Sequence, residues 1–156
     1  MVSLITPFTL TVLASSPASA LGLLGATHKQ VSRLGQAATS VVITLKPAHC
    51  KRGHLRHASL YLKGIRSNKN PGTAYRIFLN LPQDAQPDPQ RKEHIGDLNF
   101  YGIDQTSQRD YSIPFDPQLL ISSHMRTCTA TIIFVPMATL ANGSTPGIDA
   151  IEIWGK

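Results

Sequence analysis

The sequence predicts an all-β domain, an antiparallel two-sheet β-sandwich of about seven strands, Ig-like or jelly-roll-like, with little helix. From residue 39 onward, short runs of β-branched and aromatic residues alternate with clusters of turn residues. No stretch with a helical period is long enough to compete with these runs. The chain has 156 residues with 11 Gly and 11 Pro, which is typical of one turn-rich globular domain.

Each expected strand follows from the alternation of its residues. The clearest case is YRIFLNL, where Tyr75, Ile77 and Leu79 share one face while Arg76 and Phe78 lie on the other. The expected strands are residues 40–45, 58–65, 75–81, 95–103, 111–115, 129–135 and 148–154. The run 129–135 (TATIIFV) is apolar enough to be a central strand.

Proline and glycine divide these strands. Three prolines in residues 82–89 exclude both helix and central strand, so this segment is expected to be an exposed loop. Pro114 places the strand 111–115 at a sheet edge, because proline lacks the amide N–H that a neighbouring strand would need. Before the first strand, residues 21–38 fit either a turn of helix around 28–34 or an extra strand, and periodicity alone does not decide between them.

Residues 1–22 are expected to be a leader, disordered or signal-like, and residues 23–156 to form the single β-sandwich domain. An apolar stretch ends in Ala-Ser-Ala at residues 18–20, as at a signal cleavage site, but no Lys or Arg precedes it and Pro7 lies within it. The chain is thus exported if residues 1–20 are a signal peptide and is otherwise cytoplasmic. The stretch is too short and too interrupted to span a bilayer, so no membrane contact is expected.

Charge is distributed unevenly along the chain. The net charge is +6 with a pI near 9.6, and all nine acidic residues lie at or after Asp84. The basic N-terminal half is interpreted either as a solvated face or as a positive field that attracts an anionic surface, nucleic acid or an acidic partner domain. Tyr61 and Lys63 share a strand face, but ordinary strands show the same pattern and no RNA-binding motif is present, so nucleic acid is not the favoured partner.

The segment AHCKRGHLRH contains the candidate metal ligands His49, Cys50 and His54. Imidazole and thiolate groups suit Cu(I) or Zn²⁺, so these three side chains could close around such a cation. The alternative is a solvated basic linker, because the segment lies between two expected strands and no histidine pair has the spacing of the H-E-x-x-H motif. No cofactor is therefore expected, and copper at this segment is the alternative. A bridge between Cys50 and Cys128 requires neighbouring strands, which sequence does not establish.

The sequence shows no catalytic constellation. It has no G-x-S-x-G motif, no phosphate loop and no acid in the N-terminal half to orient a histidine. Asp97, Asp104, Asp110 and Asp116 could act in acid–base chemistry if two met in a cleft, but they are equally typical of turns and strand ends. Nothing in the sequence singles out a catalytic pair.

Several longer motifs resemble one known domain. The stretches LYLKGIRSNKNPGTAYRIFLNLP, HIGDLNFYG and TIIFVP, with the closing AIEIW, resemble the β-sandwich domain that follows the copper domain in tyrosinase and polyphenol oxidase-like proteins. The likeness covers roughly residues 23 to 154. It implies a non-catalytic accessory domain, since that family holds its copper pair on a separate helical bundle and the sequence contains nothing similar. No individual functional residue is carried over.

The resemblance gives a leading hypothesis and two alternatives remain. In the leading hypothesis the chain partners a di-copper oxidase catalytic domain, in cis or in trans, and covers or shapes the copper-site entrance or aids folding and copper loading. The first alternative is a basic binding module for an anionic surface or nucleic acid. The second is a small copper-binding domain that uses His49, Cys50 and His54.

Overall fold

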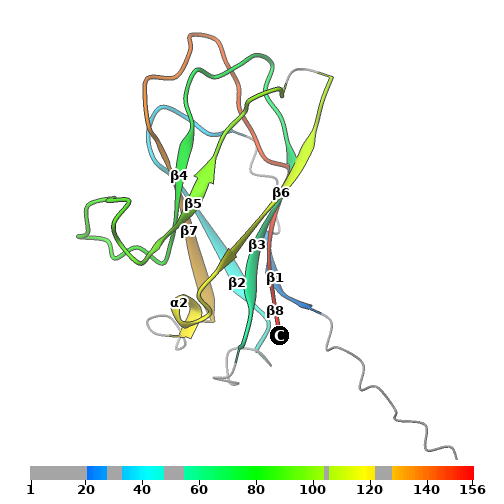
Figure 1. The fold of residues 1–156 in the computed structure, drawn as a ribbon, viewed down its shortest axis with the longest axis vertical. Coiled ribbons are helices and arrows are strands. Elements are labelled where there is room, and N and C mark those ends of the chain that lie inside the picture. Colours follow the sequence, from blue (N-terminus) through cyan, green and yellow to red (C-terminus); the bar gives the residue numbers. More distant parts are fainter. Residues whose placement is uncertain (1–20, 28–32, 48–54, 104–105, 122–127) are drawn as a thin grey trace, which may run out of the picture.

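The computed structural model describes residues 21–27, 33–47, 55–103, 106–121 and 128–156, and all structural statements concern these residues. They form eight strands and one short helix (Figure 1). The strands are β1 (Gly22–Ala26), β2 (Thr39–Leu45), β3 (Ala58–Ile65), β4 (Tyr75–Leu79), β5 (His94–Leu98), β6 (Arg109–Phe115), β7 (Thr129–Pro136) and β8 (Ala150–Gly155). The helix is α2 (Gln118–Ile121).

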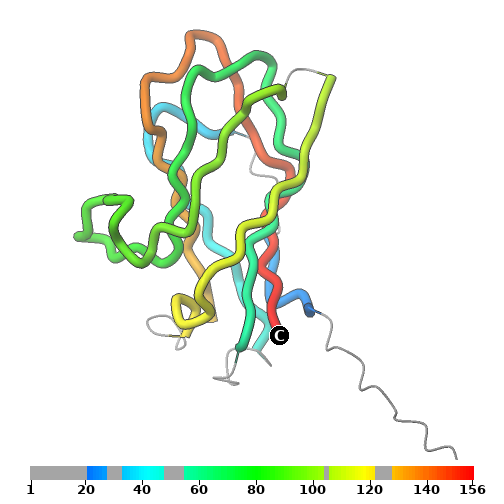
Figure 2. Tube along the Cα trace, viewed as in Figure 1, coloured from blue at the N-terminus to red at the C-terminus, as the bar shows by residue number. Residues whose placement is uncertain are grey.

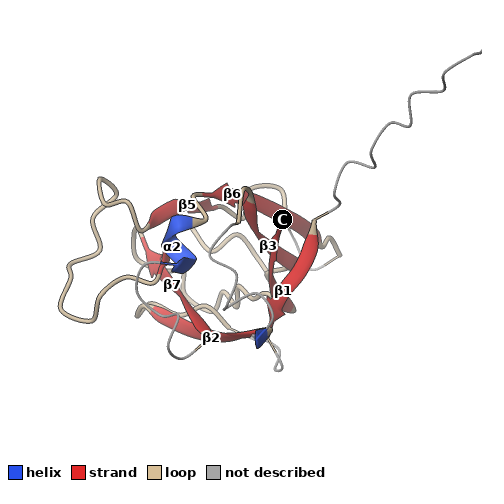
Figure 3. Ribbon diagram, turned by 90° about the horizontal axis from the view of Figure 1, so that it is seen from below, coloured by secondary structure: helices blue, strands red, loops and turns tan. Residues whose placement is uncertain are grey.

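All eight strands belong to one antiparallel sheet with the order β5-β4-β7-β2-β1-β8-β3-β6. Seen end-on, the sheet curls into a nearly closed, barrel-like ring (Figure 3). The prediction of an all-β chain with little helix is confirmed. The two-sheet sandwich is not confirmed, because the described strands form a single continuous ladder.

Strand β1 is the physical reason for this difference. It pairs with β2 on one side and with β8 on the other. Without β1, the order would separate into a four-stranded sheet, β5-β4-β7-β2, and a three-stranded sheet, β8-β3-β6. The sequence left the segment 21–38 undecided, and for residues 22–26 the extra strand is correct, whereas residues 28–32 lie outside the described part. The strand that periodicity could not assign therefore joins the two expected sheets.

The inner face of the ring is the hydrophobic core. Along β3, Ala58, Leu60 and Leu62 are buried, while Ser59 and Tyr61 between them are partly exposed. This alternation is the two-residue period of a strand with one buried face. Burying an aliphatic side chain of this size contributes about 1.5–3 kcal/mol. The same pattern on the neighbouring strands gives one continuous core.

The individual strand predictions hold with shifted ends. Strand β7 is central, between β4 and β2, and β6 with its Pro114 is an edge strand, as expected. Strand β5 ends at Leu98 rather than at residue 103, because the chain turns at Gly102, whose φ of 69° is readily adopted by glycine. The proline-rich segment after β4 projects from the side of the ring as a loop (Figure 2).

The ring has two ends. At one end lie the connections that follow β3, β5 and β7, and at the opposite end lie α2 and the C-terminus (Figures 1 and 2). Cys128, just before β7, is disulfide-bonded. The other cysteine of the sequence, Cys50, lies outside the described residues. In the described part of the chain, no helix has the length and apolar character needed to cross a membrane.

Candidate functional site

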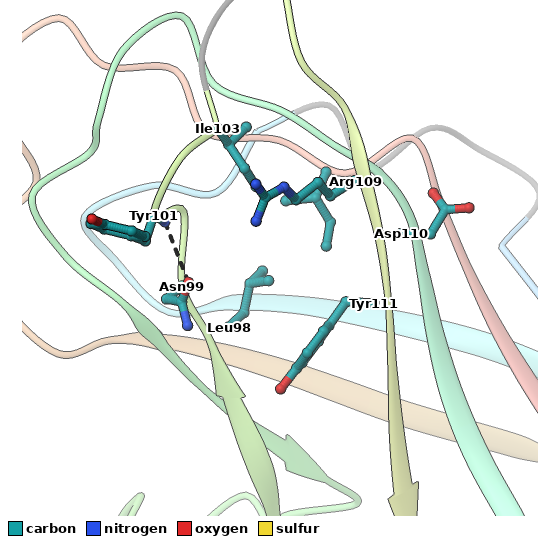
Figure 4. A pocket seen from close by; sticks show the side chains of 8 residues that line it. Leu98, Asn99, Tyr101, Ile103, Arg109, Asp110 and Tyr111 are labelled. Atoms are coloured by element: carbon teal, nitrogen blue, oxygen red, sulfur yellow. Dashed lines mark hydrogen bonds between the residues drawn. The ribbon is translucent and has the colours of Figure 1, made fainter.

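The main candidate site is a pocket at the point where the edge strands β5 and β6 diverge. We call it the seam pocket, and its volume is about 250 Å³ (Figure 4). Its walls come from the ends of β3 and β5, the turn after β5, and the start of β6. The lining residues are Ile65, Leu98, Asn99, Tyr101, Ile103, Arg109, Asp110 and Tyr111.

The sheet order explains why a pocket forms here. Strand β5 pairs only with β4, and β6 pairs only with β3, so the two edges face each other without a ladder. Side-chain packing closes the middle of this seam, because a Cβ atom at Gly96 would lie 3.2 Å from Cγ2 of Ile113. Beyond Leu98 the two strands separate and the apolar interior becomes accessible.

A tight turn after β5 presents Tyr101 to solvent. The side-chain oxygen of Asn99 accepts a hydrogen bond from the Tyr101 N–H at 3.3 Å, and the Phe100 carbonyl accepts one from the Ile103 N–H at 3.1 Å. Phe100 and Ile103 are buried on either side, whereas Tyr101 is 83% exposed. The turn is therefore anchored by its neighbours while its aromatic ring stays in water.

Arg109 carries the charge of the seam pocket. Its guanidinium extends from β6 toward the turn after β5, and a Cβ atom at Gly102 would lie 3.3 Å from its Nη2 atom (Figure 4). No ion pair joins it to any carboxylate of the described residues. The neighbouring carboxylate of Asp110 points away from the pocket and accepts a hydrogen bond from the Gly64 N–H at 2.9 Å. A positive charge thus lies uncompensated beside the buried Leu98.

This arrangement can bind but offers no recognisable chemistry. Tyrosine and arginine around an apolar depression are the residue types that dominate binding hot spots. Tyr111, which is 45% exposed, and Tyr101 provide the aromatic part, and Arg109 the polar part. No nucleophile with an adjacent base lines the pocket. Within the described ranges, no three His, Cys, Asp or Glu side chains come together in a way that could hold a metal ion.

The residues predicted as metal ligands cannot be placed. His49, Cys50 and His54 all lie outside the described residues, so the copper hypothesis for this segment stays a prediction. Cys128 is disulfide-bonded and so has no thiolate to give a metal.

The aspartates considered for acid–base chemistry have separate partners. Asp97 lies 3.0 Å from Nε2 of His94, and Asp116 accepts a hydrogen bond from the Gln118 N–H at 2.9 Å at the start of α2. Asp110 bonds to the chain at Gly64, as described above, and Asp104 lies outside the described residues. The three described aspartates act at strand ends and turns, which agrees with the interpretation of these residues as turn formers rather than as an acid–base pair.

Sequence reasoning missed Tyr101, Arg109 and Tyr111. The one available signal was the tyrosine before glycine in NFYG, which is typical of a turn that presents a side chain. Arg109 gave no signal, because its position opposite that turn depends on how the sheet curls. The His94–Asp97 pair was also missed, and it packs against Phe78 with 5.3 Å between the ring centres.

Comparison with known proteins now adds to this geometry. A family model described as "Domain of unknown function (DUF7868)" matches residues 11–113. The chain belongs to this family. No curated protein matches the DUF7868 chain.

Solved structures share the fold of the DUF7868 chain. Latent apple tyrosinase matches with a TM-score of 0.53 and 15% identity, over 77% of this chain and 26% of that one. A recombinantly expressed latent aurone synthase, a polyphenol oxidase, matches with a TM-score of 0.52 and 15% identity, over 78% and 24%. The same enzyme from its natural source gives 0.51 and 15%, over 78% and 25%.

The chain thus spans about a quarter of the length of these oxidases. At this level of identity the likeness concerns the fold. The resemblance to tyrosinase and polyphenol oxidase-like proteins, stated from sequence motifs, is confirmed at that level.

Proposed function

We propose that this chain is a non-catalytic accessory domain of a tyrosinase-like copper oxidase and acts through protein contact. It would cover or shape the entrance to the copper site, or aid the folding and copper loading of the oxidase. The observation that carries the proposal is the shared fold, which extends over 77% of this chain but only 26% of latent apple tyrosinase. A domain of this relative size fits a role beside a catalytic domain.

The seam pocket supplies the contact surface in this proposal. Tyr101 and Tyr111 expose aromatic area at its rim, above buried aliphatic side chains. Covering apolar surface contributes about 25 cal/mol per Å², and a buried tyrosine covers roughly 150–250 Å². Two such rings would therefore contribute several kcal/mol when an oxidase surface covers them.

The test is co-expression with the di-copper catalytic domain encoded in the same genome. We expect co-expression to raise the copper bound per catalytic polypeptide, or to change its rate of phenol oxidation. The double variant Tyr101→Ser/Tyr111→Ser should lose this effect. Val42→Ser is the matched control, because Val42 is also a large apolar residue, 61% exposed, on a different strand, β2.

Two results would count against the proposal. If neither copper content nor oxidation rate responds to the wild-type chain, the accessory role is wrong. If the control variant loses the effect as fully as the double variant, the contact does not lie at the seam pocket.

A second candidate, binding to an anionic surface, is favoured by one observation at the opposite end of the ring. Arg56, His57 and Lys156 line an open depression of about 340 Å³ that contains no acidic residue. On β3, by contrast, Lys63 forms an ion pair with Glu152 at 2.9 Å. Sedimentation with anionic lipid vesicles should then show binding that falls steeply with salt and weakens in Arg56→Gln. Equal sedimentation with neutral vesicles would exclude this candidate.

A further inference from the structure

We propose that the seam pocket is a binding site for a small aromatic carboxylate. The carboxylate would bind the guanidinium of Arg109, and the ring would lie against Tyr111 beside Leu98 (Figure 4). This inference goes beyond the proposed function, because it requires no oxidase and is tested on the chain alone.

The charge of the pocket selects an anion. Arg109 has no carboxylate partner among the described residues, and Asp110 is directed to the Gly64 N–H on the other side of β6. A guanidinium binds a carboxylate through two parallel hydrogen bonds, which no other side chain matches. The absence of a side chain at Gly102 leaves room for the guanidinium beside the turn.

The other polar groups of the pocket reinforce this selection. The Asn99 oxygen already accepts the Tyr101 N–H, so its amide NH₂ group remains as a donor, and the two phenol hydroxyls can also donate. None of these groups carries a negative charge. The pocket therefore offers several donors and one cation to a ligand, an arrangement that disfavours cations and suits carboxylates.

The shape of the pocket selects a flat, mostly apolar body. Its floor consists of Ile65, Leu98 and Ile103, which are all buried, and the ring of Tyr111 supplies an aromatic wall. Aromatic rings pack well against tyrosine in edge or offset contacts. The volume of about 250 Å³ is near the lower end of ligand pockets, which begin at about 300 Å³, so a ligand with one ring fits best.

The pocket is also largely preformed. Strands β5 and β6 are each held by a ladder on their outer side, and the packing of Ile113 against Gly96 fixes their separation below the pocket. A ligand would not need to order these walls, so its binding energy is not spent on that step.

The experiment is an NMR titration of the ¹⁵N-labelled full chain. Trans-cinnamate should shift the amide signals of residues 98–103 and 109–111, and these shifts should saturate as its concentration rises. Cinnamamide has the same ring and chain without the charge, and hexanoate has the charge without the ring. Both should bind at least about 10-fold more weakly, since each lacks one of the two recognised parts.

A further titration distinguishes a free aromatic acid from a peptide C-terminus, which present the same carboxylate and ring. N-acetyl-glycyl-phenylalanine presents an aromatic carboxylate as the end of a peptide, and its C-terminal amide is the neutral control. Tighter binding of this peptide than of cinnamate would assign the site to a peptide C-terminus, and the reverse order to a free acid. Either order supports the proposal if the amide binds more weakly than the acid.

Variants of two exposed arginines locate the site. Arg109→Gln should weaken cinnamate binding by about 10-fold or more, and Arg109→Lys should give an intermediate loss, because an ammonium keeps the charge but not the fork geometry. Arg56→Gln, at the opposite end of the ring, should leave binding unchanged. Unchanged melting temperatures confirm that the variants fold.

The proposal is wrong if cinnamamide binds as tightly as cinnamate, if Arg109→Gln binds like the wild type, or if no amide signal near the pocket shifts at millimolar cinnamate. None of these results bears on copper loading of an oxidase. A failure here thus leaves the accessory role intact, and a failure of co-expression leaves this site intact.

Discussion

Replacing the buried Asn80 with alanine should destabilise the fold far more than its number of hydrogen bonds suggests. Asn80 follows β4 and is only 5% exposed, with a φ of 53°. Its side-chain amide donates to the Leu119 carbonyl of α2 at 2.8 Å, and its side-chain oxygen accepts the Thr131 N–H of β7 at 2.8 Å. One side chain therefore ties the end of β4 to a central strand and to the helix.

The magnitude follows from what alanine leaves behind. The Leu119 carbonyl would lose its partner in a buried place and the Thr131 N–H in a partly buried one, which costs about 1–3 kcal/mol for each group. Alanine in the left-handed region adds roughly 1–2 kcal/mol, a penalty that asparagine tolerates better and glycine avoids. We expect a total loss of about 3–8 kcal/mol for Asn80→Ala, and about 1–2 kcal/mol less for Asn80→Gly. Domains of this size have only about 5–15 kcal/mol of stability.

The free energy of unfolding can be measured by urea titration, with the fluorescence of Trp154, the single tryptophan, beside far-UV circular dichroism. Asn68 is the matched control. Its amide donates to the Gly143 carbonyl at 2.9 Å and its oxygen accepts the Thr145 N–H at 2.7 Å, but both bonds are exposed. Asn68→Ala should cost only about 0.5–1.5 kcal/mol for each bond at most, because water replaces the lost partner. Equal losses at the two sites would refute the argument from burial.

Three further changes test other parts of the structure. Burial raises the pKa of the Tyr75 hydroxyl above its usual value near 10, so the folded state keeps this proton to higher pH than the unfolded state does. The free energy of unfolding should therefore be unaffected below pH 10 and fall above it by at most about 1.4 kcal/mol per pH unit. Tyr75→Phe should remove this slope in unfolding titrations between pH 9 and 11. The variant Cys128→Ser should lose about 2–4 kcal/mol of unfolding free energy, and a chemical reductant should reproduce the loss in the wild type but not in the variant. Gly96→Ala should cost about 1–3 kcal/mol for its φ of 154° and more for the contact with Cγ2 of Ile113. A double-mutant cycle with Ile113→Ala, which removes that atom, measures the contact; a coupling energy of zero in the same assay would show that the backbone alone sets the cost.

The positions of most strands were predictable, whereas the way they join was not. Alternation and turn residues are local signals, and they located β4 and β7 well. Strand β1 shows no such alternation, because two consecutive residues at its centre are buried and both of its edges pair with other strands, β2 and β8. Gly25 shows the constraint there, because a Cβ atom would lie 2.6 Å from the Thr44 carbonyl oxygen. The position of β1 in the sheet depends on pairing with strands far apart in sequence, and no local pattern encodes that pairing.

The seam pocket was beyond sequence reasoning for a related reason. The charge distribution directed attention to the basic N-terminal half, where Lys63 and Arg66 are in fact paired with Glu152 and Asp149. Arg109, which has no ion-pair partner among the described residues, lies in the half that contains all the acids. Whether a charge is paired depends on which strands are neighbours, so a tally along the chain does not predict it.

The open seam itself links the stability of the sheet to its binding site. Unpaired strand edges invite pairing with other chains, and this fold protects them in ways that leave the pocket intact. Strand β5 is short, Pro114 removes a donor from β6, and Ile113 against Gly96 closes the middle of the seam without a ladder. A full ladder between β5 and β6 would bring their ends together and fill the space above Leu98. The sheet therefore keeps one seam closed by side chains rather than by hydrogen bonds, and the apolar pocket with its free arginine lies where that closure stops.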